Sequence, residues 1–330
     1  CPMSFSLNKY IFLWLACMVL AGILLFMARD KETRSFIKAV VAPESTVKNS
    51  EVVVPISLVF GGDMMFDRYI RTIIRSKGSE YILNDLAGVF AKNDIVVANL
   101  EGPITQQPSV SETSLVGERN NYVFTFDPHI VDLLKQSRIG IVNIGNNHSM
   151  NFGAAGVQST KEFLAQGGVD YFGSPLPDDE RILMRDIRGT TIAFVNYNQF
   201  VAHGREKAFA DIVTARERSA DVIILYAHWG TEYVPATPAI KMLAREFVDA
   251  GVDLIIGSHP HVIQEKEVYS GKVVYYSLGN LVFDQYFSEE TKKGLLVQAT
   301  YDPRANDFSI REIPLTLEHT GQTMLTAEHE

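Results

Sequence analysis

Five short apolar runs in this chain each end near residues that bind metals or ligands, and this pattern constrains the fold most strongly. Amphipathic stretches separate the runs, and in one of them Ile240, Leu243, Ala244, Phe247 and Val248 have the spacing of one helix face. Alternating strands and helices predict an α/β fold with mainly parallel inner strands. The runs are Ile56–Phe60 before Asp63, Ile95–Ala98 before Glu101, Ile139–Ile144 before Asn147 and His148, Val222–Tyr226 before His228, and Leu254–Ile256 before His259 and His261.

The other strand-like segments predict antiparallel additions to the sheets. Arg188-Gly189 and Ser270-Gly271 each separate two such segments by the two residues that a tight hairpin requires. The C-terminal third, from Lys266 to Leu317, is mostly strand-like. We therefore expect a hairpin at each dipeptide and antiparallel strands that extend the sheets.

Charge and cysteine content exclude some functions. The chain holds 39 acidic and 30 basic residues, and its net charge of −9 divides into +3 for residues 1–50 and −12 for the rest. Nucleic-acid binding without sequence preference needs a basic surface, so we expect no nucleic-acid partner. Both cysteines, Cys1 and Cys17, precede residue 51, which excludes cysteine zinc sites and thiolate nucleophiles after that point.

The first 28 residues predict a short tail and a transmembrane anchor. From Tyr10 to Ala28 the chain has nineteen residues without a charge, bracketed by Lys9 and Arg29. A helix of this length spans about 30 Å, the hydrocarbon thickness of a bilayer. A cleaved signal peptide is the alternative, although this run is longer than the usual apolar region and lacks a clear cleavage site.

After the anchor, residues 29–50 mix charges with Ser, Thr and Pro and predict a linker, and residues 51–330 predict one large domain. The basic flank after the anchor favours a cytoplasmic domain by the positive-inside rule. Long domains can cross the membrane regardless of nearby charge, so this count does not determine the orientation.

The residues after the five runs form a donor set for divalent metal ions. Ligands of open α/β sheets bind outside the carboxyl ends of the strands, so these side chains can meet in one crevice. In an extended segment, His259 and His261 would point to the same side. Taken alone, each residue also has a structural explanation; a lone His228 is more often a hydrogen-bonded core residue. Together, oxygen and imidazole donors suit ions such as Mn, Zn or Fe, and five or six donors suit two ions.

These motifs resemble those of the calcineurin-like metallophosphoesterase superfamily. Their residues are closer still to those of one branch, the CapA-type poly-γ-glutamate capsule-synthesis proteins. The resemblance extends from about Ile56 to Leu317. The matching stretches are Phe60–Arg68 (FGGDMMFDR), Asn99–Pro103 (NLEGP), Asn146–His148 (NNH), His228–Tyr233 (HWGTEY), Gly257–Gln264 (GSHPHVIQ) and Ser277–Asn280 (SLGN).

The resemblance implies a four-layer αββα sandwich with the site at the strand ends. His148 would be the general acid beside the leaving group. Arg68 and Asn280 would orient an anionic substrate, or would serve only as a helix-cap salt bridge and a turn amide. The implied metal ligands are Asp63 and His261 for a first ion, Glu101 as a bridge, and Asn147, His228 and His259 for a second ion.

Three positions depart from the superfamily pattern. Met65 stands where the superfamily has His, and Glu101 stands where it has Asp. Ser149, which follows His148, stands where the superfamily has an acidic residue. Methionine is a poor ligand for a hard ion. The expected number of bound ions is therefore one or two.

The resemblance also implies a membrane-anchored capsule-synthesis protein with its domain on the extracytoplasmic side. Its partners would be the membrane, other components that polymerise and export the capsule polymer, and an anionic polymer or phosphoester substrate. Two alternatives stay open at this point. One is an exported metal-dependent phosphoesterase or other hydrolase that acts on an envelope substrate, and the other is an assembly scaffold with a vestigial metal site.

Overall fold

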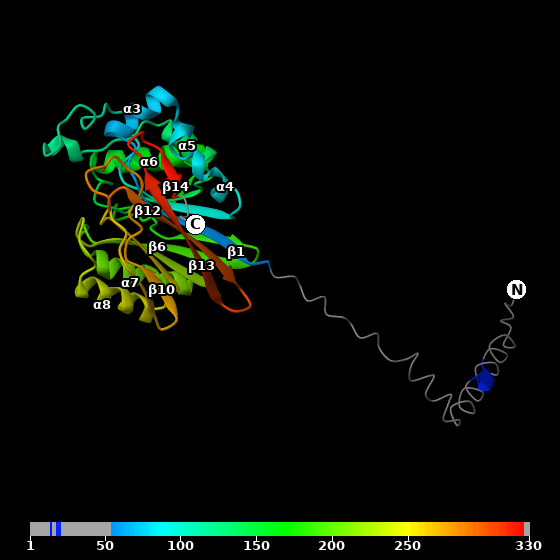
Figure 1. Ribbon diagram of the computed structural model, residues 1–330. Helices are drawn as coiled ribbons and strands as arrows, with labels where there is room; N and C mark the ends of the chain where they lie inside the picture. Colours follow the sequence, from blue (N-terminus) through cyan, green and yellow to red (C-terminus); the bar gives the residue numbers. More distant parts are fainter. Residues whose placement is uncertain (1–13, 15–17, 21–53, 327–330) are drawn as a thin grey trace, which may run out of the picture. The chain divides into compact units, whose positions relative to one another are not determined.

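The structure is a computed structural model that describes Trp14, residues 18–20 and residues 54–326 (Figure 1). The predicted anchor lies mostly, and the predicted linker entirely, outside these residues. No helix in the described part of the chain is both long and apolar enough to cross a bilayer. The boundaries given above for anchor, linker and domain stay predictions.

The first sheet has eight strands and joins a parallel half to an antiparallel half. In the parallel half, β1 (Ile56–Met64) pairs with β2 (Ile95–Leu100), followed by β3 (Ile141–Asn143) and β4 (Asp170–Phe172). On its other side, β1 pairs antiparallel with β12 (Lys293–Asp302). The sheet is completed by β13 (Asp307–Leu317), β14 (Thr323–Leu325) and β11 (Asn280–Val282), which pairs with the end of β1.

The second sheet has six strands, and its four inner strands are parallel. Its edge strands pair antiparallel with their neighbours through the two predicted hairpins, which are confirmed. Arg188 and Gly189 have φ values of 53° and 79°, as a hairpin turn that matches the strand twist requires. The strands in spatial order are β5 (Leu183–Ile187), β6 (Thr190–Asn198), β7 (Val222–His228), β8 (Leu254–Ser258), β10 (Lys272–Tyr275) and β9 (Lys266–Tyr269).

Helices cover the outer faces of both sheets, so the predicted α/β sandwich with mainly parallel inner strands is confirmed (Figure 1). On the first sheet lie α3 (Arg68–Lys77), α4 (Ala87–Phe90), α5 (Ile130–Gln136) and α6 (Gly153–Gly167), and on the second lie α7 (Gly204–Glu217) and α8 (Pro238–Asp249); short 3₁₀ turns occupy Ser79–Ile82, Asn84–Leu86 and Arg119–Tyr122.

Helix α8 shows why the sequence folds this way locally. The Thr237 side chain accepts a hydrogen bond from the Ile240 backbone N–H, and Pro238 occupies the first turn, where its missing N–H does no harm. The predicted stripe is confirmed, because Ile240, Ala244 and Phe247 are buried against the second sheet.

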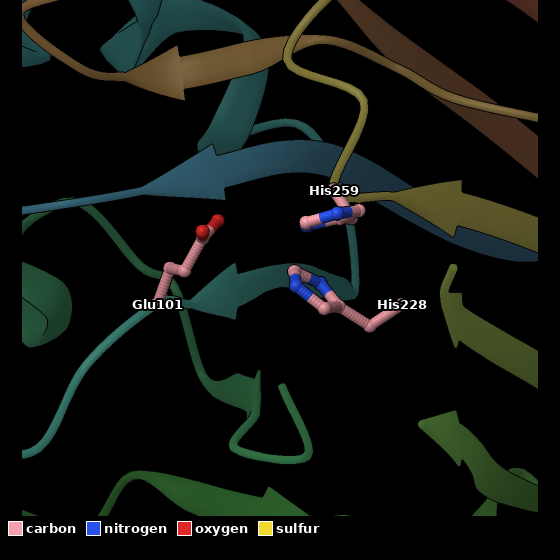
Figure 2. Close-up of side chains that lie close together, drawn as sticks. All are labelled: Glu101, His228 and His259. Atoms are coloured by element: carbon pink, nitrogen blue, oxygen red, sulfur yellow. The ribbon is translucent and has the colours of Figure 1, made fainter. Parts of the chain in front are cut away.

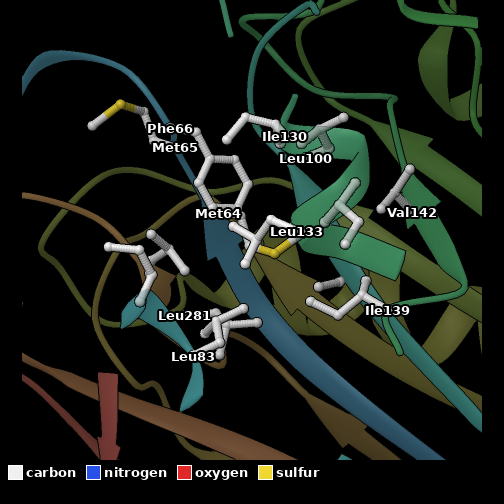
Figure 3. Close-up of a cluster of buried hydrophobic side chains, with 14 of the residues drawn as sticks. Met64, Met65, Phe66, Leu83, Leu100, Ile130, Leu133, Ile139, Val142 and Leu281 are labelled. Carbon is white, nitrogen blue, oxygen red and sulfur yellow. The ribbon is translucent and has the colours of Figure 1, made fainter. Parts of the chain in front are cut away.

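Strand alternation separates the cores of the domain. Leu58 and Phe60 of β1 face the second sheet, whereas Val59 between them faces the helices. Figure 3 shows the helix-side cluster, in which Met64 and Leu100 pack near α5. The inner strands are buried on both faces and therefore leave only their ends for polar chemistry.

Gly62 allows β1 to lie close against the segment that precedes β11 in the sequence. A Cβ on Gly62 would lie 1.8 Å from the carbonyl oxygen of Gly279, and Asp63 is the next residue. We expect Gly62→Ala to lower the free energy of unfolding by about 2 kcal/mol or more, as measured by urea denaturation.

Gly88→Ala is the matched control for this substitution. A Cβ on Gly88 of α4 would meet nothing within 4 Å, so we expect a neutral or slightly stabilising effect. Equal losses of stability in the two variants would contradict this account of the close approach.

Candidate metal centre

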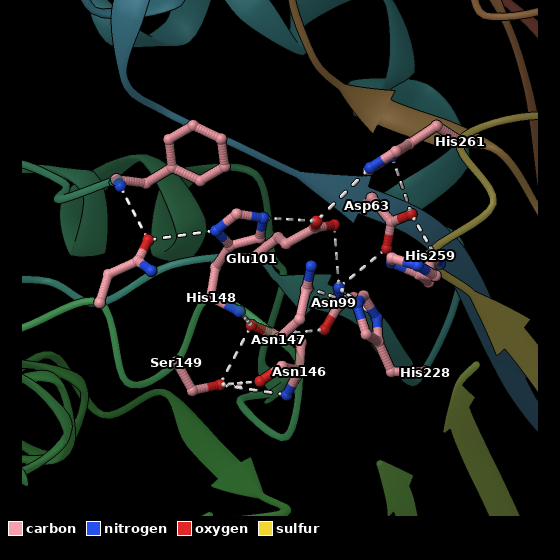
Figure 4. A network of polar contacts seen from close by, with 12 residues as sticks. Asp63, Asn99, Glu101, Asn146, Asn147, His148, Ser149, His228, His259 and His261 are labelled. Carbon is pink, nitrogen blue, oxygen red and sulfur yellow. Dashed lines mark hydrogen bonds and ion pairs between the residues drawn. The ribbon is translucent and has the colours of Figure 1, made fainter. Parts of the chain in front are cut away.

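The candidate site lies where the carboxyl ends of strands from both sheets meet (Figure 4). The structure brings together every residue for which the resemblance implied a metal-binding or acid role. The first sheet supplies Asp63 from β1, Glu101 after β2, and Asn147 and His148 after β3, and the second supplies His228 from β7 and His259 and His261 after β8.

Two fully buried carboxylates, Asp63 and Glu101, form the centre of the site. Burial and the neighbouring Asp63 charge raise the pKa of Glu101 well above its usual value. Burial also acts to raise the pKa of Asp63, but the hydrogen bond with the His261 side chain and that from the His259 backbone N–H act against it, and the pKa of Asp63 is lowered. The surroundings therefore favour the ionised form of Asp63 and disfavour that of Glu101, which a bound cation would favour.

Two of the imidazoles beside the carboxylates, those of His228 and His259, are held in the neutral form. Burial lowers the pKa of His228 well below its usual value, and it lowers the pKa of His259 to about 4 with help from the charge of His261. His228 Nε2 lies 2.8 Å from Asn147 Oδ1, and His228 Nδ1 lies 2.9 Å from Ser258 Oγ. Neutral imidazole is the form that binds metal ions.

We predicted an extended backbone at His259 and His261, and this prediction is wrong. The two residues follow β8 with φ values of 94° and 56°, in the left-handed region that side chains other than glycine rarely adopt. Their rings still lie 6.0 Å apart and both face the centre (Figure 4). A strained turn, not the period of a strand, places the two imidazoles together.

The donor set fits divalent metal ions. Among the described residues, Glu101 Oε1 and His259 Nδ1 are buried and have no hydrogen-bond partner, which is costly unless another group binds them. Figure 2 shows Glu101, His228 and His259 pointing toward one another, and their donor atoms lie within 4.8 Å of one another. The same holds for Asp63, Glu101 and His261, so Glu101 belongs to both groups.

One further acid lies beside this cluster and was missed by the sequence analysis. Glu232, in the loop after β7, forms a third close group with His259 and His261. The signal for it was its position inside the stretch His228–Tyr233 that carries the resemblance.

A buried network of asparagines behind the carboxylates was also missed. The Asn99 carboxamide oxygen accepts hydrogen bonds from Asn143 at 2.9 Å and Asn146 at 3.1 Å, and the Asn196 amide binds Asn143 in turn. These donors fix the Asn99 amide group, which points its N–H toward Asp63 Oδ1 at 2.8 Å and Glu101 Oε2 at 3.5 Å. The signal was the extended-chain period of two that separates Asn99 from Glu101.

His148 lies at the border of the cluster. Its Nε2 atom is 3.8 Å from Glu101 Oε1, its Nδ1 atom is 3.1 Å from Asn151 Oδ1, and its ring packs 4.3 Å from that of Phe124. Burial lowers the pKa of His148 to about 4. The free protein therefore holds His148 neutral at pH 7, and the acid role implied for it requires an anionic ligand that raises this pKa.

The two weaker substrate positions, Arg68 and Asn280, have clear structural partners. Arg68 begins α3, forms an ion pair with Asp284 and donates to Asn121 Oδ1 at 3.1 Å. Asn280 is fully buried, and its Oδ1 lies 3.0 Å from His261 Nδ1. Asn280 thus orients a site histidine, whereas Arg68 lines a cavity beside the site.

Met65 and Ser149, where the chain departs from the superfamily pattern, serve the fold. Met65 is fully buried in the helix-side cluster, and its sulfur accepts a hydrogen bond from the Asp67 N–H at 3.0 Å (Figure 3). The Ser149 hydroxyl accepts from the Asn146 N–H at 3.1 Å and donates to the Ile144 carbonyl. It thereby secures the turn that presents Asn147 and His148.

Comparison with known families agrees with this geometry. The sequence profile described as "Bacterial capsule synthesis protein PGA_cap" matches residues 57–285, a span that includes the whole cluster. The chain belongs to this family. The predicted kinship with CapA-type proteins is confirmed.

Individual relatives extend the comparison. The "PGA biosynthesis protein CapA" of Bacillus subtilis (strain 168) is 31% identical over 260 residues, which cover 74% of this chain and 67% of the relative. The "Capsule biosynthesis protein CapA" of Bacillus anthracis is 26% identical over 342 residues, covering 92% and 82%. A crystal structure of a hypothetical protein from Thermus thermophilus shares the fold with a TM-score of 0.50 at 14% identity, covering 78% of this chain and 98% of that one.

Asn99 offers a test of the asparagine network. Asn99→Ala removes the N–H group that orients Asp63, and we expect metal affinity to fall about 10- to 100-fold in isothermal titration with Mn²⁺. Asn84→Ala, at an exposed position before α4, is the control and should leave the affinity unchanged. An Asn99→Ala protein that is folded and binds Mn²⁺ as the unmodified chain does would contradict the positioning role.

Proposed function

We propose that this chain is a membrane-anchored protein of poly-γ-glutamate capsule biosynthesis whose domain binds one or two divalent metal ions and hydrolyses an anionic envelope substrate. Two observations support the proposal. The chain belongs to a capsule synthesis family, and its cluster leaves Glu101 Oε1 and His259 Nδ1 buried without partners in the described structure. The second observation carries the catalytic part, since an inert core would satisfy or avoid such atoms.

The proposed centre divides the ligands between two positions. When bound, ions such as Mn, Zn or Fe would polarise a phosphoryl or carbonyl oxygen and activate water. A metal charge near Glu101 would also lower its raised pKa and keep that carboxylate ionised. Asp63 and His261 would hold the first ion, Glu101 would bridge, and Asn147, His228 and His259 would hold the second.

His148 would handle the proton of the leaving group. Its Nδ1 faces the carbonyl oxygen of the Asn151 side chain, so Nδ1 carries the hydrogen and Nε2 is free toward the centre. An anionic substrate beside Nε2 would raise the His148 pKa from about 4 and allow that atom to hold a proton for transfer.

The four-layer arrangement is, in this proposal, of the metallophosphoesterase type, with its site on the extracytoplasmic side of the membrane. The named relatives act in capsule or PGA biosynthesis, which favours partners that polymerise and export an anionic polymer. The net charge of −12 after residue 50 disfavours nucleic acid and leaves bound metal as the local positive charge for an anionic substrate.

Metal analysis of the purified full-length chain tests the centre. We expect one or two equivalents of a divalent ion, and we expect His259→Ala and His261→Ala to lower metal affinity by at least about 100-fold, with loss of phosphodiester turnover. His129→Ala, on an exposed histidine paired with Asp127, should leave both unchanged. Correctly folded protein that binds no divalent ion would refute the catalytic proposal.

A capsule assay separates the enzyme from a scaffold. Deleting the gene should abolish surface polymer, and expression of the unmodified chain should restore it. We expect the His261→Ala chain, produced at the same level, to fail in this complementation, because a hydrolase needs its metal ligands. Full restoration by His261→Ala would favour an assembly role, and unchanged polymer in the deletion strain would contradict the capsule function.

A further inference from the structure

Glu232 lies on the segment between β7 and α8, and it is partly exposed to solvent. A carboxylate oxygen of Glu232 and one ring nitrogen each of His259 and His261 lie within 4.8 Å of one another. The two histidines are only 4% and 2% exposed, so Glu232 connects this buried group to the protein surface. Carboxylate and imidazole are both ligand types that divalent metal ions bind.

Two backbone hydrogen bonds fix the segment of Glu232 against the turn that carries the two histidines. The Trp229 N–H donates to the Ser258 carbonyl oxygen at 3.2 Å, and the Tyr233 N–H donates to the Pro260 carbonyl oxygen at 2.9 Å. Tyr233 has a φ of 63°, a left-handed backbone that is costly and persists where its surroundings hold it. The position of Glu232 beside the imidazoles is therefore set by the same turn that places them.

Three carboxylates share this neighbourhood without a basic partner. Within residues 54–326, Asp63 and Glu101 lie at ion-pair distance from histidines, and Glu232 forms no ion pair with a lysine or arginine. Burial and the Asp63 charge raise the pKa of Glu101, and the charge of Glu232 adds to this effect. A divalent ion would balance these like charges, which otherwise repel one another.

The two proposed ion positions differ in their number of ligands. With the bridge Glu101 counted in both, the first position, beside Asp63 and His261, has one ligand fewer than the second. An ion such as Mn²⁺ accepts about six ligands, so the first position has more room for a further protein ligand.

Other side chains near the first position are not available to fill this place. Met65 is buried in the helix-side cluster, and its sulfur already accepts a backbone hydrogen bond. Asn280 Oδ1 lies 3.0 Å from His261 Nδ1 and so binds that ring instead. Among the described acids and histidines, Glu232 is the further residue that groups with His261.

We propose that Glu232 is a metal ligand of this centre and binds the ion that is held by His261. The assignment rests on the proposed metal-dependent function and adds a residue to its ligand set. In the free protein the carboxylate lies beside His259 and His261; in the loaded protein one of its oxygens binds the ion directly.

Calorimetric titration of the full-length chain in detergent with Mn²⁺ tests this role with two variants. Glu232→Gln keeps the size of the side chain and removes its charge, whereas Glu232→Asp keeps the charge and withdraws the carboxylate by one methylene. We expect the affinity for Mn²⁺ to fall at least about tenfold in Glu232→Gln and at least about threefold in Glu232→Asp. Glu217→Gln, at the exposed end of α7, is the matched control and should bind Mn²⁺ as the unmodified chain does.

The visible absorption spectrum of the Co²⁺-loaded chain gives a second measurement that does not depend on activity. This spectrum responds to the number and kind of ligands around the ion. We expect it to change in both Glu232 variants and to stay the same in Glu217→Gln.

The outcomes separate this role from the metal centre on which it rests. An unmodified chain that is folded and binds no divalent ion contradicts both. Unchanged affinity and spectrum in both Glu232 variants overturn the ligand role and leave the metal centre intact. Weaker binding in Glu232→Gln, with Glu232→Asp unchanged in affinity and spectrum, also overturns it, because the carboxylate would then act through its charge alone.

Discussion

Two carboxylates buried side by side, Asp63 and Glu101, set the conditions for everything around them. Two like charges a few ångströms apart and away from water repel strongly, so one of them must gain a proton or a cation must join them. Hydrogen bonds from His261, the His259 backbone and Asn99 reduce the free-energy cost of burying an ionised Asp63. It leaves Glu101 Oε1 unsatisfied within the described chain, and this imbalance is what a divalent ion would remove.

The fold tolerates this concentration of polar groups because of where it places them. Parallel strands with apolar faces fill the space between the sheets and between each sheet and its helices, so the polar side chains are confined to the strand ends. The left-handed backbone at His259 and His261 costs about 1–3 kcal/mol at each residue. The flanking strand β8 pairs on both sides and supplies the rigidity that holds this turn.

Sequence patterns predicted the parts of the structure that depend on local rules. The apolar runs, the α8 stripe and both hairpins follow from periodicity and turn chemistry, and the structure confirms them. That the ligands come from two different sheets was not predicted, because strand order is a property of the whole chain. The position of the residues after the apolar runs and the motif order supplied by the resemblance both pointed to the site. The asparagine network and the left-handed backbone of the two histidines were not predicted, because they depend on contacts between distant segments. The burial of the Met65 side chain in the core was likewise not predicted, because it is set by packing against the helices.

The central claim is that Glu101 joins two sets of metal ligands at the meeting point of the sheets. Anomalous difference maps from crystals of the domain grown with Mn²⁺, recorded at the manganese edge, test it most directly. We predict one or two peaks in contact with Glu101, one bounded by Asp63 and His261 and the other by His228 and His259. Maps without a peak in this cluster, or with a peak only beside Glu232, would contradict the claim.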